Sequence, residues 1–474
     1  MERVFRINAG LKGVTRILSG TIRTGGFVAL GAAIGYAGSV DSLHMKLLET
    51  AFLLLGLLLG LHMYFKSPHN LIPYTLVIWT VSPEARRFLD WTFKTYNDTS
   101  MIMLTPYCVS LILLIPILKH FKQMDSRVRL ILKIIGAALI YGFLLGFLKY
   151  GLSSVYELLS LLVPFLVFVY VHISKFDRTV WDRWLRSYAF LAVLVGAYGI
   201  YQYLVLPPWD HFWMVHAEMN SVGLPEPQKF RLFSFLNSPG PAGLFLGFAL
   251  PIMIVQKKWR VLGIVGIMIV GFALLLTLVR VSWICSIIMI LGYFARSHLK
   301  SKVKLLALSV FMIVAYVFVL PALPGANEVS SRISTFESLE EDHSFNERLV
   351  FARNIVSDVI SHPLGRGIGS SGLGVKLTQS SDTLKVFDNG YLNLFYLFGL
   401  PLGLGVIFML IYIFFLLFKI SKKEKIYAPI SFAAISATLF LLLGSNVLSG
   451  LSGYILMLVI SFAFSHTIPK RRDT

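Results

Sequence analysis

Apolar runs recur along almost the whole 474-residue chain, and short polar segments rich in lysine and arginine separate them. A helix formed by one such run is long enough to cross a hydrocarbon core of about 30 Å. The runs are too long and uniform to be strands of a membrane barrel. We therefore predict an all-α, polytopic integral membrane protein, a bundle of about 12–14 transmembrane helices. The fourteen expected spans are 24–40, 46–65, 70–83, 100–118, 129–148, 153–172, 187–206, 233–255, 260–278, 281–295, 303–322, 389–418, 427–443 and 448–465.

The twelfth expected span is too long for one crossing of the membrane. Its first part is expected along the outer surface, before the segment Gly399-Leu400-Pro401 turns the helix inward. Glycine and proline favour such a break because one adopts unusual backbone angles and the other removes a helical hydrogen bond.

The positive charges predict an orientation. Most of the 43 lysines and arginines fall on one side of the expected spans, and most of the 24 acidic residues fall on the other. Since positive loops stay in the cytoplasm, both termini are expected to be cytoplasmic. The net charge of +19 is then mostly cytoplasmic, where it attracts anionic lipid headgroups and requires no nucleic acid as partner.

The composition supports this class and excludes several others. Apolar residues make up 56% and charged residues 14%, against roughly 25% charged in a soluble domain. The inner loops are short, and the sequence has neither a glycine-rich phosphate loop ending in Lys-Ser/Thr nor an Asp-x-Asp pair. Cys108 and Cys285 lie inside apolar runs without metal-ligand spacing. We expect no cofactor and no metal site.

The polar chemistry is expected outside, in segments 207–231 and 323–388. The longer segment predicts a helical extracytoplasmic subdomain between two membrane regions, 1–322 and 389–474. Its helix is expected to begin with a capping box and to carry an apolar stripe on one face. The residues concerned are Ser344 and Glu347 for the cap, Leu349, Ala352, Val356 and Val359 for the stripe, and Pro363 and Gly365 for the end.

Three arginines stand at the expected outer boundary: Arg231, Arg280 and Arg348. Any one of them can simply extend its charge into water. Arg280, however, sits in a tight outer hairpin where the positive-inside rule disfavours it, and this favours a functional role. A guanidinium donates two parallel hydrogen bonds to phosphate oxygens, so converging arginines suit a diphosphate.

Four sequence blocks resemble, in order, those of the O-antigen ligase/polymerase superfamily. They are RLFSFLNSPGPAG (231–243), TLVRVSW (277–283), NERLVFARNIVSDVISHPLGRGIG (346–369) and FDNGYLNLFYLFGLPLG (387–403). The resemblance implies a metal-independent glycosyltransferase whose donor is an undecaprenyl-diphosphate-linked oligosaccharide. It also implies partners such as a flippase and a chain-length regulator, and an active site facing the periplasm or the cell exterior.

The same resemblance assigns the site residues. Arg231, Arg280 and Arg348 would hold the diphosphate, and Arg231 and Arg280 would also act in catalysis. We further expect Asn389, Arg353 and His343 beside the substrate. Ligases begin the fourth block with a histidine, the base, whereas this chain has Asp388, which favours a polymerase over a ligase. A carboxylate can accept a hydroxyl proton. Two alternatives stay open: Asp388-Asn389-Gly390 as a turn or helix cap, and His343 as another base or a solvated residue.

Further polar groups carry weaker expectations. Five glycines between 365 and 374 predict a flexible loop, and the cluster Arg86, Arg87 and Asp90 predicts an ion-paired segment at the interface. Glu49 and Glu157 lie near outer span ends. A flippase is the alternative of another class, but it would be expected to show internally repeated halves and charges at mid-membrane depth, which the sequence lacks.

Overall fold

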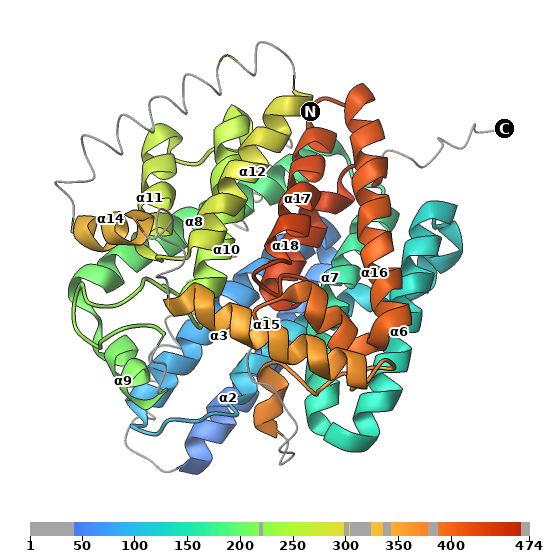
Figure 1. Ribbon diagram of the computed structural model, residues 1–474. Coiled ribbons are helices and arrows are strands. Elements are labelled where there is room, and N and C mark those ends of the chain that lie inside the picture. Colours follow the sequence, from blue (N-terminus) through green and yellow to red (C-terminus); the bar gives the residue numbers. More distant parts are fainter. Residues whose placement is uncertain are drawn as a thin grey trace, which may run out of the picture.

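The computed structural model describes residues 42–217, 221–297, 303, 324–334, 343–377 and 387–465. In these ranges the regular elements are helical, and the β pairing consists of a single bridge between Gly223 and Phe230. The prediction of an all-α bundle is confirmed (Figure 1).

The helices follow the expected spans closely. The elements of the first half are α2 (Ser42–Lys66), α3 (Leu71–Thr92), α4 (Thr105–Ser110), α5 (Leu114–His120), α6 (Ser126–Tyr150), α7 (Leu152–Ile173), α8 (Arg178–Val205) and α9 (Pro208–His216). Those of the second half are α10 (Pro239–Val255), α11 (Gly263–Leu276), α12 (Arg280–Arg296), α14 (Ala326–Ser334), α15 (His343–Ser361), α16 (Gly390–Lys423), α17 (Tyr427–Leu441) and α18 (Gly450–Ser461). Short 3₁₀ turns join several of them, and three such turns together with α4 and α5 make 101–123 one nearly continuous helical rod.

Six of these helices are long and apolar enough to cross a membrane by themselves. They are His44–Lys66, Met101–Gln123, Ser126–Tyr150, Leu152–Ile173, Arg178–Val205 and Gly390–Lys423. Shorter apolar helices, α10, α11, α17 and α18, lie among them. The expected span 24–40 lies beyond the residues that the structure describes. So does the expected span 303–322, except for residue 303.

α3 extends beyond the third expected span, and α16 contains the break expected in the twelfth. The third span was expected to end at residue 83, but α3 continues to Thr92 because its charged last turns are buried in ion pairs. The expected break in the twelfth span is confirmed. Gly399 has φ 72° and ψ 175° within α16, a conformation that only glycine adopts without strain.

One end of the bundle collects the elements that carry the candidate residues. Ser234, in the segment before α10, donates its N–H to Gln202 Oε1 near the end of α8 at 2.8 Å. Leu232 N–H bonds the carbonyl of Leu276 at the end of α11 at 3.0 Å. This is the end that the sequence predicts to face outward, and we call it the predicted outer end.

Candidate active site

Arg231 is anchored on the turn that leads into Arg280. Its Nε donates to the carbonyl oxygen of Thr277 at 3.1 Å and its Nη2 to that of Leu278 at 3.3 Å. Its Nη1 donates to the carbonyl of Ser221 at 3.2 Å. A guanidinium has five N–H groups, so this arrangement leaves two for a ligand. The arginine thus fixes the α11–α12 turn and keeps hydrogen-bonding capacity for a ligand.

The arginines are close enough to act on one another. The pKa of Arg231 is lowered to about 10, first by burial and then by three positive neighbours, Arg332, Arg348 and Arg280. Arg231 still carries its charge at neutral pH. Four positive groups from different elements therefore gather at the predicted outer end, an arrangement suited to a multiply charged anion. We call Arg231, Arg280, Arg332 and Arg348 the arginine cluster.

Arg332 was missed by the sequence reasoning. It lies on α14, a nine-residue helix outside the four blocks, and its neighbours in sequence carry no motif. The available signal was the short run Ala326–Ser334, an amphipathic helix with Arg332 in its last turn. A cation near a helix C-terminus is also favoured by the helix dipole, so position alone gave no reason to single it out.

Asp388 lies against Arg348. Nε of Arg348 donates to Oδ2 of Asp388 at 3.3 Å, and both side chains are about two-fifths exposed. Arg348 comes from the second turn of α15, and Asp388 directly precedes α16. The structure thus brings the candidate base and one candidate phosphate-binding residue together at one accessible place.

Asn389 is a helix cap. Its Oδ1 accepts from the N–H of Leu392 at 3.0 Å, and its Nδ2 donates to the carbonyl of Leu443 at 3.1 Å. The cap satisfies a free donor at the start of α16. Gly390 follows in close contact with the end of α17, where its N–H bonds the carbonyl of Leu442 at 2.8 Å. The alternative of a cap therefore holds for Asn389, and these bonds fix the backbone next to Asp388.

The two other candidates lie on α15. Arg353 is exposed, one and a half turns beyond Arg348. The backbone of His343 begins α15, and its side chain is outside the described part of the chain.

α15 packs on the first part of α16, and Figure 1 shows it running across the bundle. Phe351, Ile355 and Val359, spaced four residues apart, face Phe387 and Tyr396. Such a row forms one face of a helix. This packing holds Arg348 beside the start of α16.

The predicted apolar stripe of α15 is therefore partly wrong. Val359 is buried as expected, but Leu349 and Val356 are 44% and 43% exposed. The helix packs through the row that holds the aromatic Phe351 and Val359, and Leu349 and Val356 of the expected row face outward.

The glycine-rich segment 365–374 is not the expected flexible loop. Ile368 is fully buried, and its N–H bonds the carbonyl of Gly142 in α6 at 2.7 Å. Ser154 Oγ of α7 donates to the carbonyl of Ile368 at 2.6 Å. Gly367 has φ 92°, and a Cβ there would overlap the backbone of Gly146. The glycines allow the chain to pack directly on helix backbones, so this segment is an ordered part of the fold that packs between α6 and α7.

A buried ionic network supports the segment that carries Arg231. Arg87 on α3 pairs with Glu84, and its Nε lies 3.2 Å from Oδ1 of Asp210 in α9. It also donates to the carbonyls of Ser234 at 2.6 Å and of Leu236 at 3.2 Å. Arg86 and Asp90 form a second buried pair, so the ion pairs predicted for this cluster are present but lie inside the protein. The bonds of Arg87 fix the chain at Ser234 and Leu236.

Fold and site define a class: an all-helical integral membrane protein with an arginine cluster beside a carboxylate. In the described residues no group of three or more His, Cys, Asp or Glu side chains is placed to hold a metal ion.

Residues 263–407 match the family model described as O-Antigen ligase. The match confirms the resemblance and places this part of the chain in the O-antigen ligase/polymerase superfamily, which indicates glycan processing in a membrane. It includes Arg280, Arg348 and Asp388, whereas Arg231 precedes it. A comparison with curated proteins finds no match.

Proposed function

We propose that the protein polymerises undecaprenyl-diphosphate-linked oligosaccharide repeat units into a surface or exported polysaccharide. The reaction would take place on the outer face of a bacterial cytoplasmic membrane. The observation that carries this proposal is the arginine cluster around Arg231, together with the pairing of Arg348 and Asp388. A diphosphate leaving group needs positive charge, and an acceptor hydroxyl needs a nearby proton acceptor.

In the proposed reaction, an acceptor sugar hydroxyl attacks the anomeric carbon of the donor. The new glycosidic C–O bond forms as the bond from that carbon to the diphosphate breaks, and its electron pair leaves with the diphosphate. The hydroxyl proton passes to the carboxylate of Asp388. The arginines stabilise the charge that develops on the diphosphate, so the proposal requires no metal ion or cofactor.

Aspartate at position 388 supports a polymerase over a ligase, because the ligase pattern has a histidine there. A ligase would use the same donor and leaving group, but would transfer the finished glycan to a different acceptor. A flippase and a chain-length regulator are the proposed partners of a polymerase, since repeats must reach the outer face and chains must end.

The decisive residue to change is Arg280, at the start of α12. We expect Arg280→Ala to abolish long-chain product and Arg280→Lys to restore only part of it, because lysine lacks the bidentate geometry. Glycan length on gels and the level of the inserted protein should be measured together. Normal product from a stably inserted Ala variant would overturn the role of Arg280.

Deletion of the gene distinguishes a polymerase from a ligase. Single repeats left on the lipid carrier would support a polymerase. Finished chains left on the carrier would show a ligase and contradict the proposal.

A further inference from the structure

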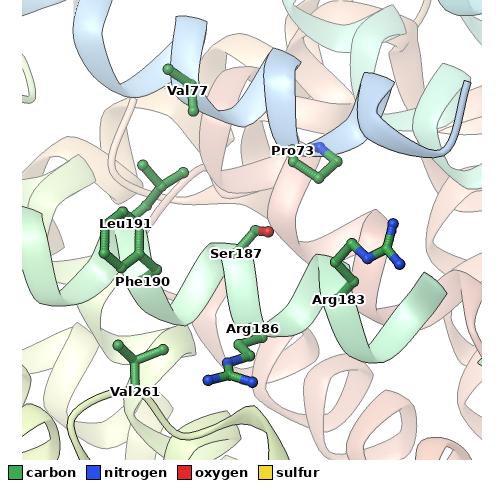
Figure 2. A pocket seen from close by; sticks show the side chains of 8 residues that line it. All are labelled: Pro73, Val77, Arg183, Arg186, Ser187, Phe190, Leu191 and Val261. Carbon is green, nitrogen blue, oxygen red and sulfur yellow. The ribbon is translucent and has the colours of Figure 1, made fainter. Parts of the chain in front are cut away.

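A groove lies near the other end of the bundle, between α3, α8 and the turn before α11. It encloses about 410 Å³ and is shown in Figure 2. Its lining from α8 follows helical spacing along one face. The lining residues are Pro73, Val77, Arg183, Arg186, Ser187, Phe190, Leu191 and Val261.

The groove is separate from the candidate active site. Arg186 lies in the third turn of α8, whereas Gln202, which contacts Ser234, lies in its last turns. The 16 residues between them correspond to about 24 Å at the helical rise of 1.5 Å per residue. The positive-inside rule assigns the groove's end of α8 to the cytoplasmic side.

The lining changes character along the helix axis. Arg183, Arg186 and Ser187 come first from the start of α8, and Phe190 and Leu191 follow about one turn deeper. Charge therefore lies at the mouth and apolar surface lies toward the middle of the bundle. Phe190 is 51% exposed, so the apolar part is open to a neighbouring molecule.

The two arginines keep their charge available. Both are exposed, and within the described residues neither is paired with a carboxylate. The adjacent acid, Asp182, is already engaged, since Lys258 Nζ lies 2.8 Å from its Oδ1 and Trp259 donates to the same atom at 2.7 Å. Figure 2 shows the guanidinium ends of Arg183 and Arg186 directed apart, one turn from each other on α8. Both side chains are long and exposed, so each can turn toward a phosphate at the mouth of the groove and donate hydrogen bonds to it.

We propose that this groove binds an anionic phospholipid of the inner leaflet, with its phosphate on Arg183 and Arg186 and an acyl chain along Phe190, Leu191 and Val77. A lipid joins phosphate and hydrocarbon in the order that the lining presents. A free anion would leave the apolar wall without a function.

The test uses the full-length protein, purified in detergent and titrated with short-chain phosphatidylglycerol or phosphatidylcholine. Bound lipid is counted by native mass spectrometry. Arg183→Gln with Arg186→Gln should weaken binding of phosphatidylglycerol at least about tenfold, since both charged hydrogen-bond donors to the phosphate are removed. Phosphatidylcholine should bind weakly to both proteins.

The matched control is Lys122→Gln with Arg127→Gln, which removes two exposed charges at the same end of the bundle, away from the groove. We expect it to bind phosphatidylglycerol like the unchanged protein. Val77→Trp, at a 38% exposed position, should block the apolar part and weaken lipid binding. Equal loss in both charge pairs would overturn the site, because binding would then follow net charge alone.

Inorganic phosphate is the final probe. The proposal requires that millimolar phosphate fails to displace the lipid. Displacement by phosphate, with no effect of Val77→Trp, would show an anion site and overturn the lipid as occupant.

Discussion

Arg348 and Asp388 are 40 positions apart in the sequence, yet Nε of one lies 3.3 Å from Oδ2 of the other. Their side chains are 41% and 42% exposed, so the pair adds at most about 1 kcal/mol to stability. A substitution here should consequently change activity much more than folding. Because substitutions of Arg348 or Asp388 should leave folding nearly unchanged, a loss of activity in such variants reports on the proposed chemistry.

We expect Asp388→Asn to lower turnover by about 100-fold or more, because an amide cannot accept the hydroxyl proton. The purified protein should be assayed for chain growth from a lipid-linked donor, with its thermal midpoint as control. Asp388→Glu should retain part of the activity. A stable Asn variant with unchanged rate and chain length would exclude Asp388 as the base.

The double variant Arg348→Ala with Asp388→Asn tests whether the two residues act as a unit. If Asp388 acts mainly by positioning Arg348, its loss should matter little once Arg348 is gone, and the effects will not add. Additive losses would indicate independent roles for the base and the phosphate-binding arginine.

Arg332 should contribute to donor binding although no sequence block contains it. We expect Arg332→Gln to raise the donor KM by about tenfold, since it removes one of the three charges around Arg231. Lys229→Gln is the matched control, because Lys229 lies two residues from Arg231 and is exposed in a 2.6 Å ion pair with Glu226. Similar changes in KM for both variants would point to a general charge effect and contradict a specific role.

The sequence predicted the elements far better than their contacts. Long apolar runs define spans without any knowledge of neighbours, and Gly399 and Pro401 marked the break in α16. Arg332 could not be found in this way, because only the path of the chain outside the spans brings α14 to Arg231. The choice between Phe351 and Leu349 as the packed row of α15 likewise depends on Phe387 and Tyr396, which a helical pattern cannot reveal.

The glycine-rich segment was misjudged for a related reason. A run such as Gly365–Gly374 has the composition of a flexible loop. Its hydrogen bonds to Gly142 and Ser154 join it to helices more than 200 residues earlier, and no local pattern of residues indicates such distant packing.

Arg87 should be essential for stability. Arg87→Ala leaves Glu84 and Asp210 buried without their cation, and such a loss costs about 3–5 kcal/mol. We expect a large drop in the thermal midpoint and in the amount of inserted protein. Lys258→Gln breaks a more exposed pair with Asp182 and should cost no more than about 1 kcal/mol. Equal midpoints for the two variants would show that the buried network does not stabilise the fold.

The insertion of segment 365–374 can be tested with two glycines of the same helix. A Cβ on Gly146 would overlap the carbonyl oxygen of Ile368, whereas a Cβ on Gly136 would meet no atom within 4 Å. Both lie inside α6, so alanine improves helix propensity by a similar amount, up to about 1 kcal/mol, at either position. Any difference between the two variants therefore reports the contact with the inserted segment.

We expect Gly136→Ala to leave the thermal midpoint unchanged or slightly higher, and Gly146→Ala to lower it by the equivalent of about 1–3 kcal/mol. Gly146→Ala should also reduce activity, because Arg366 N–H and Gly367 N–H bond the carbonyls of Tyr396 and Leu397 in α16, just beyond Asp388. Displacing the segment would disturb that part of α16. Identical midpoints and activities for the two alanine variants would mean that the segment does not pack on α6, and α16 would then depend on α15 and α17 alone for its position.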